Sequence, residues 1–169
     1  MDPGQIEMIE AHGTGTKIGD PIEAEGLRLA FSASGIHRPK SCALTALKSN
    51  IGHLNMAAGV ASFIKTVLSI HYNEIYPIVH FESGNHLIPW ADMPVRPVRQ
   101  LESFCCSERL AGVTALGLSG TNVHLLMGLQ SISEAAGSDR PEPVQPFAYL
   151  TIDAEKAKAD YRQSCARIH

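Results

Sequence analysis

The chain has 169 residues, a formal net charge of -3 and a hydrophobic fraction of 44%. This length suits one domain with a short appendage, and it is sufficient to bury a hydrophobic core without disulfides. The ordinary apolar fraction excludes a wholly disordered chain. The near-neutral charge, without a long basic run, argues against nucleic acid as the main partner.

The apolar segments and the N-terminal residues predict a cytoplasmic protein without a membrane span. No stretch reaches the roughly 18 consecutive apolar residues that a membrane-spanning helix needs, and residues 1–5 lack the features of a secretory signal. The four cysteines form no C-x-x-C pair, which favours reduced thiols. The eight histidines show no H-x-x-x-H or H-E-x-x-H spacing, so no metal site is expected.

The first predicted elements are a strand, a glycine-rich turn and a helix. Alternation of apolar and polar residues indicates the strand over residues 5–11. The turn covers residues 12–19. The helix, over residues 21–32, is expected to begin with Asp20 as its N-cap and with Glu23 completing a capping box.

A second strand over residues 42–47 and a second helix over residues 55–71 follow. Apolar residues surround the whole circumference of this helix, and Lys65 is its only charge before His71. A helix that is apolar on all sides is expected to be buried on all sides.

The rest of the chain divides into an irregular region, a hairpin and a tail. Residues 72–110 contain several prolines and are expected to form only short strands, whereas residues 111–128 read as a β-hairpin. The order strand, helix, strand, helix, hairpin indicates an α/β layer structure with a mixed sheet. We expect one domain over residues 1–128, a linker over 129–146, and a β-α tail over 147–169.

The first candidate site is the sequence EAHGTGT, residues 10–16. A dinucleotide-binding G-x-G-x-x-G pattern would need glycine at position 18, where the chain has isoleucine. The alternative is that the glycines bend the backbone tightly behind His12 and present its imidazole at the end of the strand, where open α/β sheets place ligands. Thr14 and Thr16 offer hydroxyls at the same rim. The purely structural interpretation is that His12 is a loop histidine whose ring nitrogens are hydrogen-bonded within the loop.

The second candidate site, KSNIGH, also lies between a strand end and a helix start. Two equivalent strand ends would bring Lys48 and His53 to the same rim as His12. Histidine suits proton transfer or hydrogen bonding to a developing oxyanion, and a nearby lysine would keep an imidazole neutral by lowering its pKa. A surface lysine and a helix-capping histidine explain the spacing equally well.

The third candidate site is the hairpin turn GLSGTN, residues 117–122. It lacks the spacing of a G-x-S-x-G nucleophile elbow, and a strand follows it rather than a helix, so Ser119 is not expected to be a nucleophile. Backbone N–H groups of such a turn could donate to an oxyanion. A purely structural turn is the alternative.

Together these segments resemble the C-terminal half of β-ketoacyl synthases, particularly the ketosynthase domains of modular polyketide synthases. The resemblance rests on IEAHGTGTKIGDPIEAEGL, ALKSNIGHLNMAAGVASFIKTVLSI and AGVTALGLSGTNVHLLM, which occur in the family's order. It implies the C-terminal half of a thiolase-like αβαβα fold, with helix 55–71 in the central layer. It also implies the family reaction, a decarboxylative Claisen condensation of an acyl thioester with a malonyl-type extender on an acyl carrier protein. The tail is similar to the start of the linker that follows such ketosynthases.

The resemblance assigns roles to individual residues. His12 and His53 would be the two active-site histidines, which hold the thioester carbonyl and stabilise the enolate, with electrostatic support from Lys48. Thr14 and Thr16 would contact the pantetheine arm.

The backbone N–H of Leu118 would belong to the oxyanion hole, and its side chain to the acyl gate. No directly bound cofactor is implied, because the phosphopantetheine arm of the carrier protein serves as substrate carrier. Expected partners are the acyl carrier protein and the remainder of a synthase, and the complete family member would be a homodimer.

One departure from the family bears on activity. The family nucleophile is a cysteine in a small-residue, serine-rich motif of the N-terminal half, and none of Cys42, Cys105, Cys106 and Cys165 lies in such a motif. We therefore expect a partial ketosynthase that is inactive alone, whether a split-gene product, a gene remnant or an excerpt of a longer synthase. It should associate through the apolar helix. The alternative is a non-catalytic module that binds the carrier protein or its pantetheine arm.

Overall fold

A five-stranded mixed sheet forms the centre of the domain in the computed structural model, which describes residues 3–35 and 40–129. The sheet has the order β3-β2-β1-β4-β5, in which the first four strands run parallel and β5 runs antiparallel to β4. This agrees with the expected mixed sheet. The strands are β1 (Met8–Glu10), β2 (Cys42–Thr45), β3 (Val95–Pro97), β4 (Ala111–Leu116) and β5 (Asn122–Met127).

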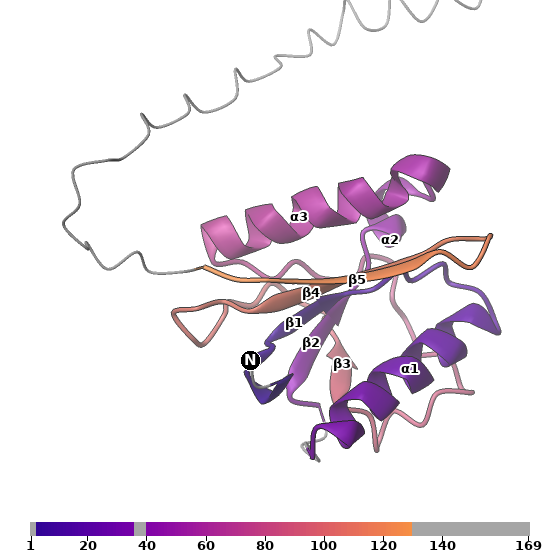
Figure 1. The fold of residues 1–169 in the computed structure, drawn as a ribbon, viewed down its shortest axis with the longest axis horizontal. Coiled ribbons are helices and arrows are strands. Elements are labelled where there is room, and N and C mark those ends of the chain that lie inside the picture. Colours follow the sequence, from indigo (N-terminus) through magenta and orange to yellow (C-terminus); the bar gives the residue numbers. More distant parts are fainter. Residues whose placement is uncertain (1–2, 36–39, 130–169) are drawn as a thin grey trace, which may run out of the picture. The chain divides into compact units, whose positions relative to one another are not determined.

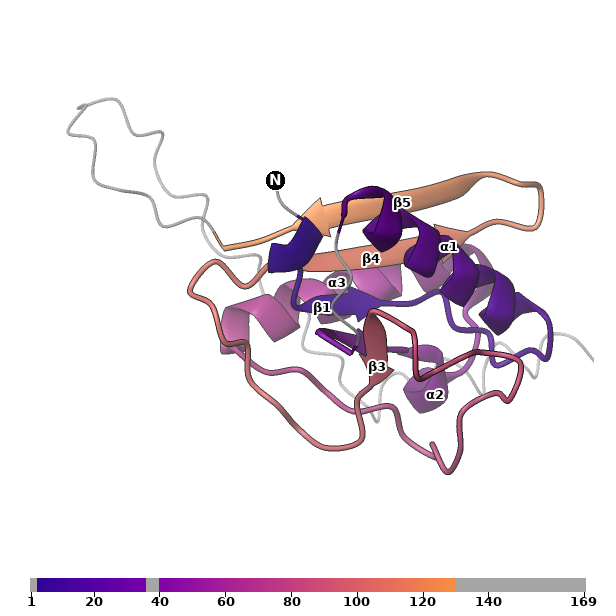
Figure 2. The ribbon, with the colours of Figure 1, turned by 90° about the horizontal axis from the view of Figure 1, so that it is seen from below.

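Helices cover both faces of the sheet. Figure 1 shows α1 on one face and α3 on the other, and the same arrangement is visible from below in Figure 2. This placement follows from the right-handed connections that parallel strands require. The described helices are η1 (Pro3–Gln5), α1 (Gly19–Ala33), α2 (Lys48–Ile51), η2 (Asn55–Ala57) and α3 (Ala58–Tyr72), where η marks a 3-10 helix.

Two hydrophobic cores lie on the two faces of the sheet. Neighbouring strand residues alternate between them, because successive side chains of a strand point to opposite faces. Ile9 packs toward Leu27 and Phe31 of α1, whereas the adjacent Met8 packs in the cluster that contains Ile70 of α3. The short strands are therefore buried on both faces, as parallel strands in α/β proteins usually are.

The expectation that helix 55–71 is buried on all sides is wrong for the described part of the chain. The side of α3 that is buried carries mainly small and polar residues, among them Ser62, Thr66 and Ser69. The other side is exposed because no described segment covers it. Its large apolar residues, which we call the outer face of α3, are Val60, Phe63, Ile64, Val67 and Leu68.

The predicted capping box at the start of α1 is also wrong. The helix begins at Gly19, its N-cap position is Ile18, and no side chain caps it. Asp20 and Glu23 instead accept hydrogen bonds from the glycine-rich turn. The local spacing was right for a cap, but the turn folds back over the helix start and brings its own N–H groups to these carboxylates.

Other boundaries agree closely with the sequence. The predicted helix over 55–71 begins as η2 and continues as α3, and the hairpin strands β4 and β5 fall within residues 111–128. None of the described helices is long and apolar enough to cross a membrane. The predicted linker and tail, residues 129–146 and 147–169, lie outside the described residues except for Leu129.

Candidate functional site

The ends of two adjacent parallel strands bring His12 and Lys48 together. β1 and β2 pair in parallel, with Glu10 opposite Thr45 at their carboxyl ends. His12 follows β1 by two residues, and Lys48 opens α2 just after β2. The Lys48 Nζ lies 3.4 Å from Nδ1 of His12, although 36 residues separate them in the sequence.

His53 completes this group from the other end of α2. Its ring meets that of His12 edge-to-face, with 5.6 Å between the ring centroids. The backbone N–H of Asn55 donates to Nδ1 of His53 over 3.0 Å, which assigns the proton of a neutral ring to Nε2. This hydrogen bond occupies only Nδ1, so Nε2 stays available for a functional role.

The electrostatics of the group keep His12 neutral. Burial lowers the pKa of His12 below its usual value of 6.5, and the positive charges of Lys48 and His53 lower it further. This agrees with the expectation that Lys48 favours the neutral imidazole. Burial also lowers the pKa of Lys48, while the nearby carboxylates of Glu10 and Glu23 oppose that shift. With the Lys48 ammonium facing Nδ1, a neutral His12 carries its proton on Nε2.

A buried ion pair beneath the site was missed by the sequence reasoning. The Lys65 ammonium of α3 lies 2.7 Å from Oε2 of Glu10, whose side chain is 0% exposed. The same carboxylate accepts hydrogen bonds from the Thr45 hydroxyl at 2.5 Å and the Leu47 backbone N–H at 2.6 Å. Glu10 therefore ties α3, β2 and the residue before Lys48 to β1. The one signal in the sequence was Lys65, a single charge in an otherwise apolar helix, because a buried charge needs a partner.

Three backbone N–H groups of the glycine-rich turn are already hydrogen-bonded to carboxylates of this chain, so they are not free to bind a phosphate. Both oxygens of Glu23 accept hydrogen bonds from the backbone N–H groups of His12 and Gly13, at 2.7 and 3.0 Å. Asp20 accepts one from Gly15 at 3.1 Å. Because anion sites of this kind use backbone N–H groups, this arrangement weighs against the dinucleotide interpretation.

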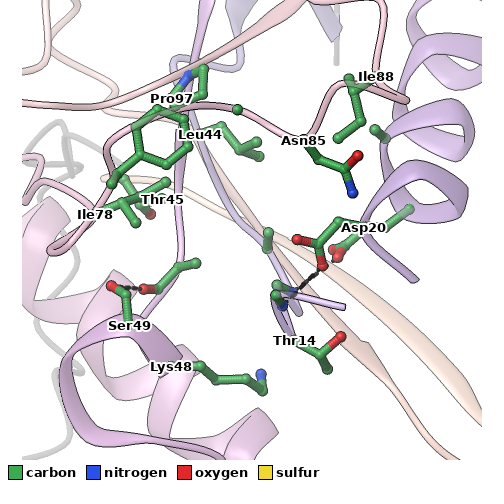
Figure 3. A pocket seen from close by; sticks show the side chains of 18 of the residues that line it. Thr14, Asp20, Leu44, Thr45, Lys48, Ser49, Ile78, Asn85, Ile88 and Pro97 are labelled. Carbon is green, nitrogen blue, oxygen red and sulfur yellow. Dashed lines mark hydrogen bonds between the residues drawn. The ribbon is translucent and has the colours of Figure 1, made fainter. Parts of the chain in front are cut away.

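A half-open cavity of about 730 Å³ lies on the α1 side of the site. Figure 3 shows Thr14 and Lys48 together at one end of it. Thr14 lines the cavity, whereas Thr16 does not, and the two threonine hydroxyls are 3.1 Å apart. The volume lies within the range of small-molecule sites. Its apolar lining includes Leu27, Leu44, Ile78, Phe81, Ile88 and Trp90.

Leu118 stands apart from the histidines and Lys48. It lies in the turn between β4 and β5, its side chain is fully exposed, and it takes no part in the contacts that join His12, Lys48 and His53. Its predicted role in the oxyanion hole stays a prediction.

The described cysteines are free, and the surroundings of Cys42 and Cys106 differ from those of an activated nucleophile. Burial raises the pKa of the Cys42 thiol to about 12. Cys105 and Cys106 are exposed, and the nearby Glu7 carboxylate raises the pKa of the Cys106 thiol. A reactive cysteine needs the opposite environment. Within the described ranges, no group of three His, Cys, Asp or Glu side chains is placed to hold a metal ion.

The parallel strands with paired histidines at their carboxyl ends define an α/β domain with a candidate catalytic edge. Residues 1–82 match the family described as "Beta-ketoacyl synthase, C-terminal domain". Polyketide synthase ThaG of Burkholderia thailandensis is 38% identical over 148 residues, which are 85% of this chain and 3% of ThaG. A phenolphthiocerol/phthiocerol polyketide synthase of Mycobacterium tuberculosis is 36% identical over 160 residues, 94% of this chain and 11% of that protein.

Solved ketosynthases have the same fold. Ketosynthase twelve of the bacillaene polyketide synthase from Bacillus amyloliquefaciens matches with a TM-score of 0.74 and 33% identity, over 78% of this chain and 24% of that one. The module 6 ketosynthase of the bacillaene synthase from Bacillus subtilis gives 0.73 and 34%, over 77% of this chain and 24% of the other. These matches support a C-terminal ketosynthase domain of a modular polyketide synthase. The chain spans only a small part of the relatives it matches.

Proposed function

We propose that this chain supplies the histidine half of a ketosynthase active centre and acts in decarboxylative Claisen condensation. The observation that carries the proposal is the group of His12, His53 and Lys48. The imidazoles of His12 and His53 meet at one edge of the sheet, and Nδ1 of each ring is engaged, which leaves Nε2–H to donate. Two such donors suit an oxygen that gains negative charge during the reaction.

In this reaction the residues of the chain hold charge rather than form bonds. Loss of CO2 from the malonyl-type extender breaks a C–C bond, and its electron pair forms a thioester enolate. His12 and His53 donate hydrogen bonds to the enolate oxygen, and Lys48 keeps His12 neutral so that it remains a donor without a competing proton transfer. The enolate carbon attacks the acyl thioester carbon and the cysteine thiolate leaves. The Leu118 backbone N–H is proposed to donate to the oxygen of that acyl group.

The nucleophilic cysteine would come from an N-terminal ketosynthase half. The surroundings of the described Cys42 and Cys106 raise the pKa of each thiol, and the chain covers about a quarter of the solved ketosynthases. The outer face of α3 is the surface on which that half is proposed to pack, because it exposes five large apolar side chains. The chain alone is therefore expected to be inactive.

The substrate would arrive on the phosphopantetheine arm of an acyl carrier protein. Thr14 lines the cavity beside Lys48, and its hydroxyl can hydrogen-bond to the amides of the arm. Thr16 is proposed to act with it through the contact between the two hydroxyls. The arm acts as substrate carrier, so the proposal includes no resident cofactor.

Coexpression with a ketosynthase N-terminal half that carries the cysteine tests this function. The pair is expected to decarboxylate malonyl-carrier protein, and His53→Ala should abolish the activity. His71→Ala is the matched control, because His71 lies at the exposed end of α3 and contacts Tyr72. If carrier protein binds but no mixture turns over, the chain is a non-catalytic binding module and the proposed function is wrong.

A further inference from the structure

A single loop segment, residues 83–90, forms part of the cavity wall, and we call it the strap. Its residues that line the cavity are Ser83, Gly84, Asn85, His86, Ile88 and Trp90. The Trp90 indole packs on Gly84, where a Cβ would clash with it, and its Nε1–H donates to the Asn85 carbonyl over 3.1 Å. Ile88 is 6% exposed and lies in the core between α1 and the sheet. Packing therefore fixes the C-terminal end of the strap.

The side chain of Asn85 joins the other end of the strap to the glycine-rich turn. Its Nδ2 donates to the Lys17 carbonyl over 3.1 Å, although 68 residues separate them. Its Oδ1 accepts from the Leu87 backbone N–H over 3.0 Å. The two bonds fix the orientation of the amide, because a flipped amide would set its oxygen against the Lys17 carbonyl oxygen. Among the described residues, no other hydrogen bond joins the strap to residues 12–19.

The cavity that the strap borders has a polar and an apolar part. Figure 3 shows Leu44, Ile88 and Pro97 around the part that lies away from Thr14 and Lys48. The whole cavity holds about 730 Å³. Because apolar walls gain affinity from the apolar surface that they remove from water, this part suits an alkyl chain rather than a charged group.

We propose that the apolar part of the cavity binds the alkyl chain of an uncharged ligand, and that Asn85 sets the affinity by latching the strap to the glycine-rich turn. This goes beyond the proposed function, because the ligand is not the arm held at Thr14. Without the bond to Lys17, residues 83–85 can move away from the turn while Ile88 stays in the core. The cavity then opens to water, and a bound chain buries less apolar surface.

Binding can be followed through Trp90, which is the only tryptophan of the chain and lines the cavity. The probes are 1-butanol and 1-hexanol, which differ by two methylenes. One fully buried methylene contributes a factor of about four in affinity. Because the cavity is half open, 1-hexanol should bind the unmodified 169-residue chain about tenfold more tightly than 1-butanol. Equal dissociation constants, or no response of the Trp90 fluorescence, would overturn the proposal.

The latch is tested with Asn85→Asp. Aspartate keeps an oxygen for the Leu87 N–H but has no N–H for the Lys17 carbonyl, so only the bond across the cavity is lost. The preference for 1-hexanol should fall to about threefold or less, and acrylamide should quench Trp90 more strongly. Gln100→Glu is the matched control, because it makes the same amide-to-carboxylate change at an exposed residue that does not line the cavity. Identical results for the two variants would refute the role of Asn85.

An NMR measurement on the unmodified chain tests the latch even if Asn85→Asp does not fold. The side-chain NH2 protons of Asn85 should exchange with solvent more slowly than those of Gln100. Saturation with 1-hexanol should slow them further, because a ligand favours the state that binds it better. Equal exchange of the two amides, or no effect of 1-hexanol, would also overturn the proposal. None of these readouts depends on turnover, so an inactive reconstituted pair would count against the proposed function only.

Discussion

The two long helices of the domain face the sheet in opposite ways. α1 turns Ala24, Leu27 and Phe31 toward the sheet, as a surface helix normally turns its apolar side. Its charged residues lie away from this core, with Glu25 exposed and the others half-buried. α3 buries small and polar side chains and exposes its large apolar ones. The difference teaches that the apolar side of α1 is buried by this chain itself, whereas the large apolar side chains of α3 need a second layer to cover them. This agrees with the place of α3 in the thiolase-like fold.

One of the two largest effects is expected at the ion pair between Lys65 of α3 and Glu10 of β1, which joins α3 to the sheet. Lys65→Met leaves the Glu10 carboxylate buried without its cation, and this should reduce the free energy of unfolding by about 3 to 5 kcal/mol. Urea denaturation measures the loss. Arg28→Met removes an exposed ion pair of α1 and should change little.

The Lys65→Met prediction has an internal check. Adding Glu10→Gln to Lys65→Met removes the unpaired charge and should recover part of the loss, because most of the penalty comes from the buried carboxylate. A double variant as unstable as the sum of the single ones would contradict the role given to the ion pair.

A matched pair of phenylalanines tests the opposite orientation of the helices. Phe31 of α1 is 4% exposed and Phe63 of α3 is 38% exposed. Phe31→Ala should cost about 3 to 5 kcal/mol of unfolding free energy, as usual for a core phenylalanine. Phe63→Ala should cost less than about 1 kcal/mol in the chain alone. Equal losses in urea denaturation would mean that the outer face of α3 is covered in solution.

The outer face of α3 should also govern association. Ile64 and Val67 are 53% and 42% exposed, so the double variant Ile64→Glu/Val67→Glu should fold normally while its light scattering and dye binding fall toward those of a monomer. The same variant should no longer pair with an N-terminal ketosynthase half, because two buried carboxylates would meet its apolar surface. If the unmodified chain is a monomer that binds no dye, the expected association is wrong.

Much of this architecture follows from local sequence signals. The alternating segments predicted β1, β2 and the hairpin, and parallel strand ends predicted that His12 and Lys48 would meet. Glu10 and Lys65 could not be paired in this way, because they are 55 residues apart and their contact depends on how α3 crosses the sheet. The hydrogen bonds of Glu23 to the backbone of the glycine-rich turn could not be predicted from the sequence, because the spacing of Glu23 from Asp20 also fits a capping box. Apolar residues around α3 indicate a helix made to be covered, but they do not say whether the covering layer belongs to the same chain.

The smallest expected effect concerns the buried side of α3. Among the described residues, Ser69 Oγ is a buried side-chain atom without a hydrogen-bond partner. Ser69→Ala removes that unsatisfied group and nearly keeps the volume, so the chain should become more stable by up to about 1 kcal/mol. Thr66→Val is the matched comparison, because the Thr66 hydroxyl donates to the Ser62 carbonyl over 2.9 Å and its loss should not stabilise. If urea denaturation instead shows that Ser69→Ala is less stable, the Ser69 hydroxyl has a hydrogen-bond partner in solution. The buried side of α3 then makes more hydrogen bonds than the structure shows.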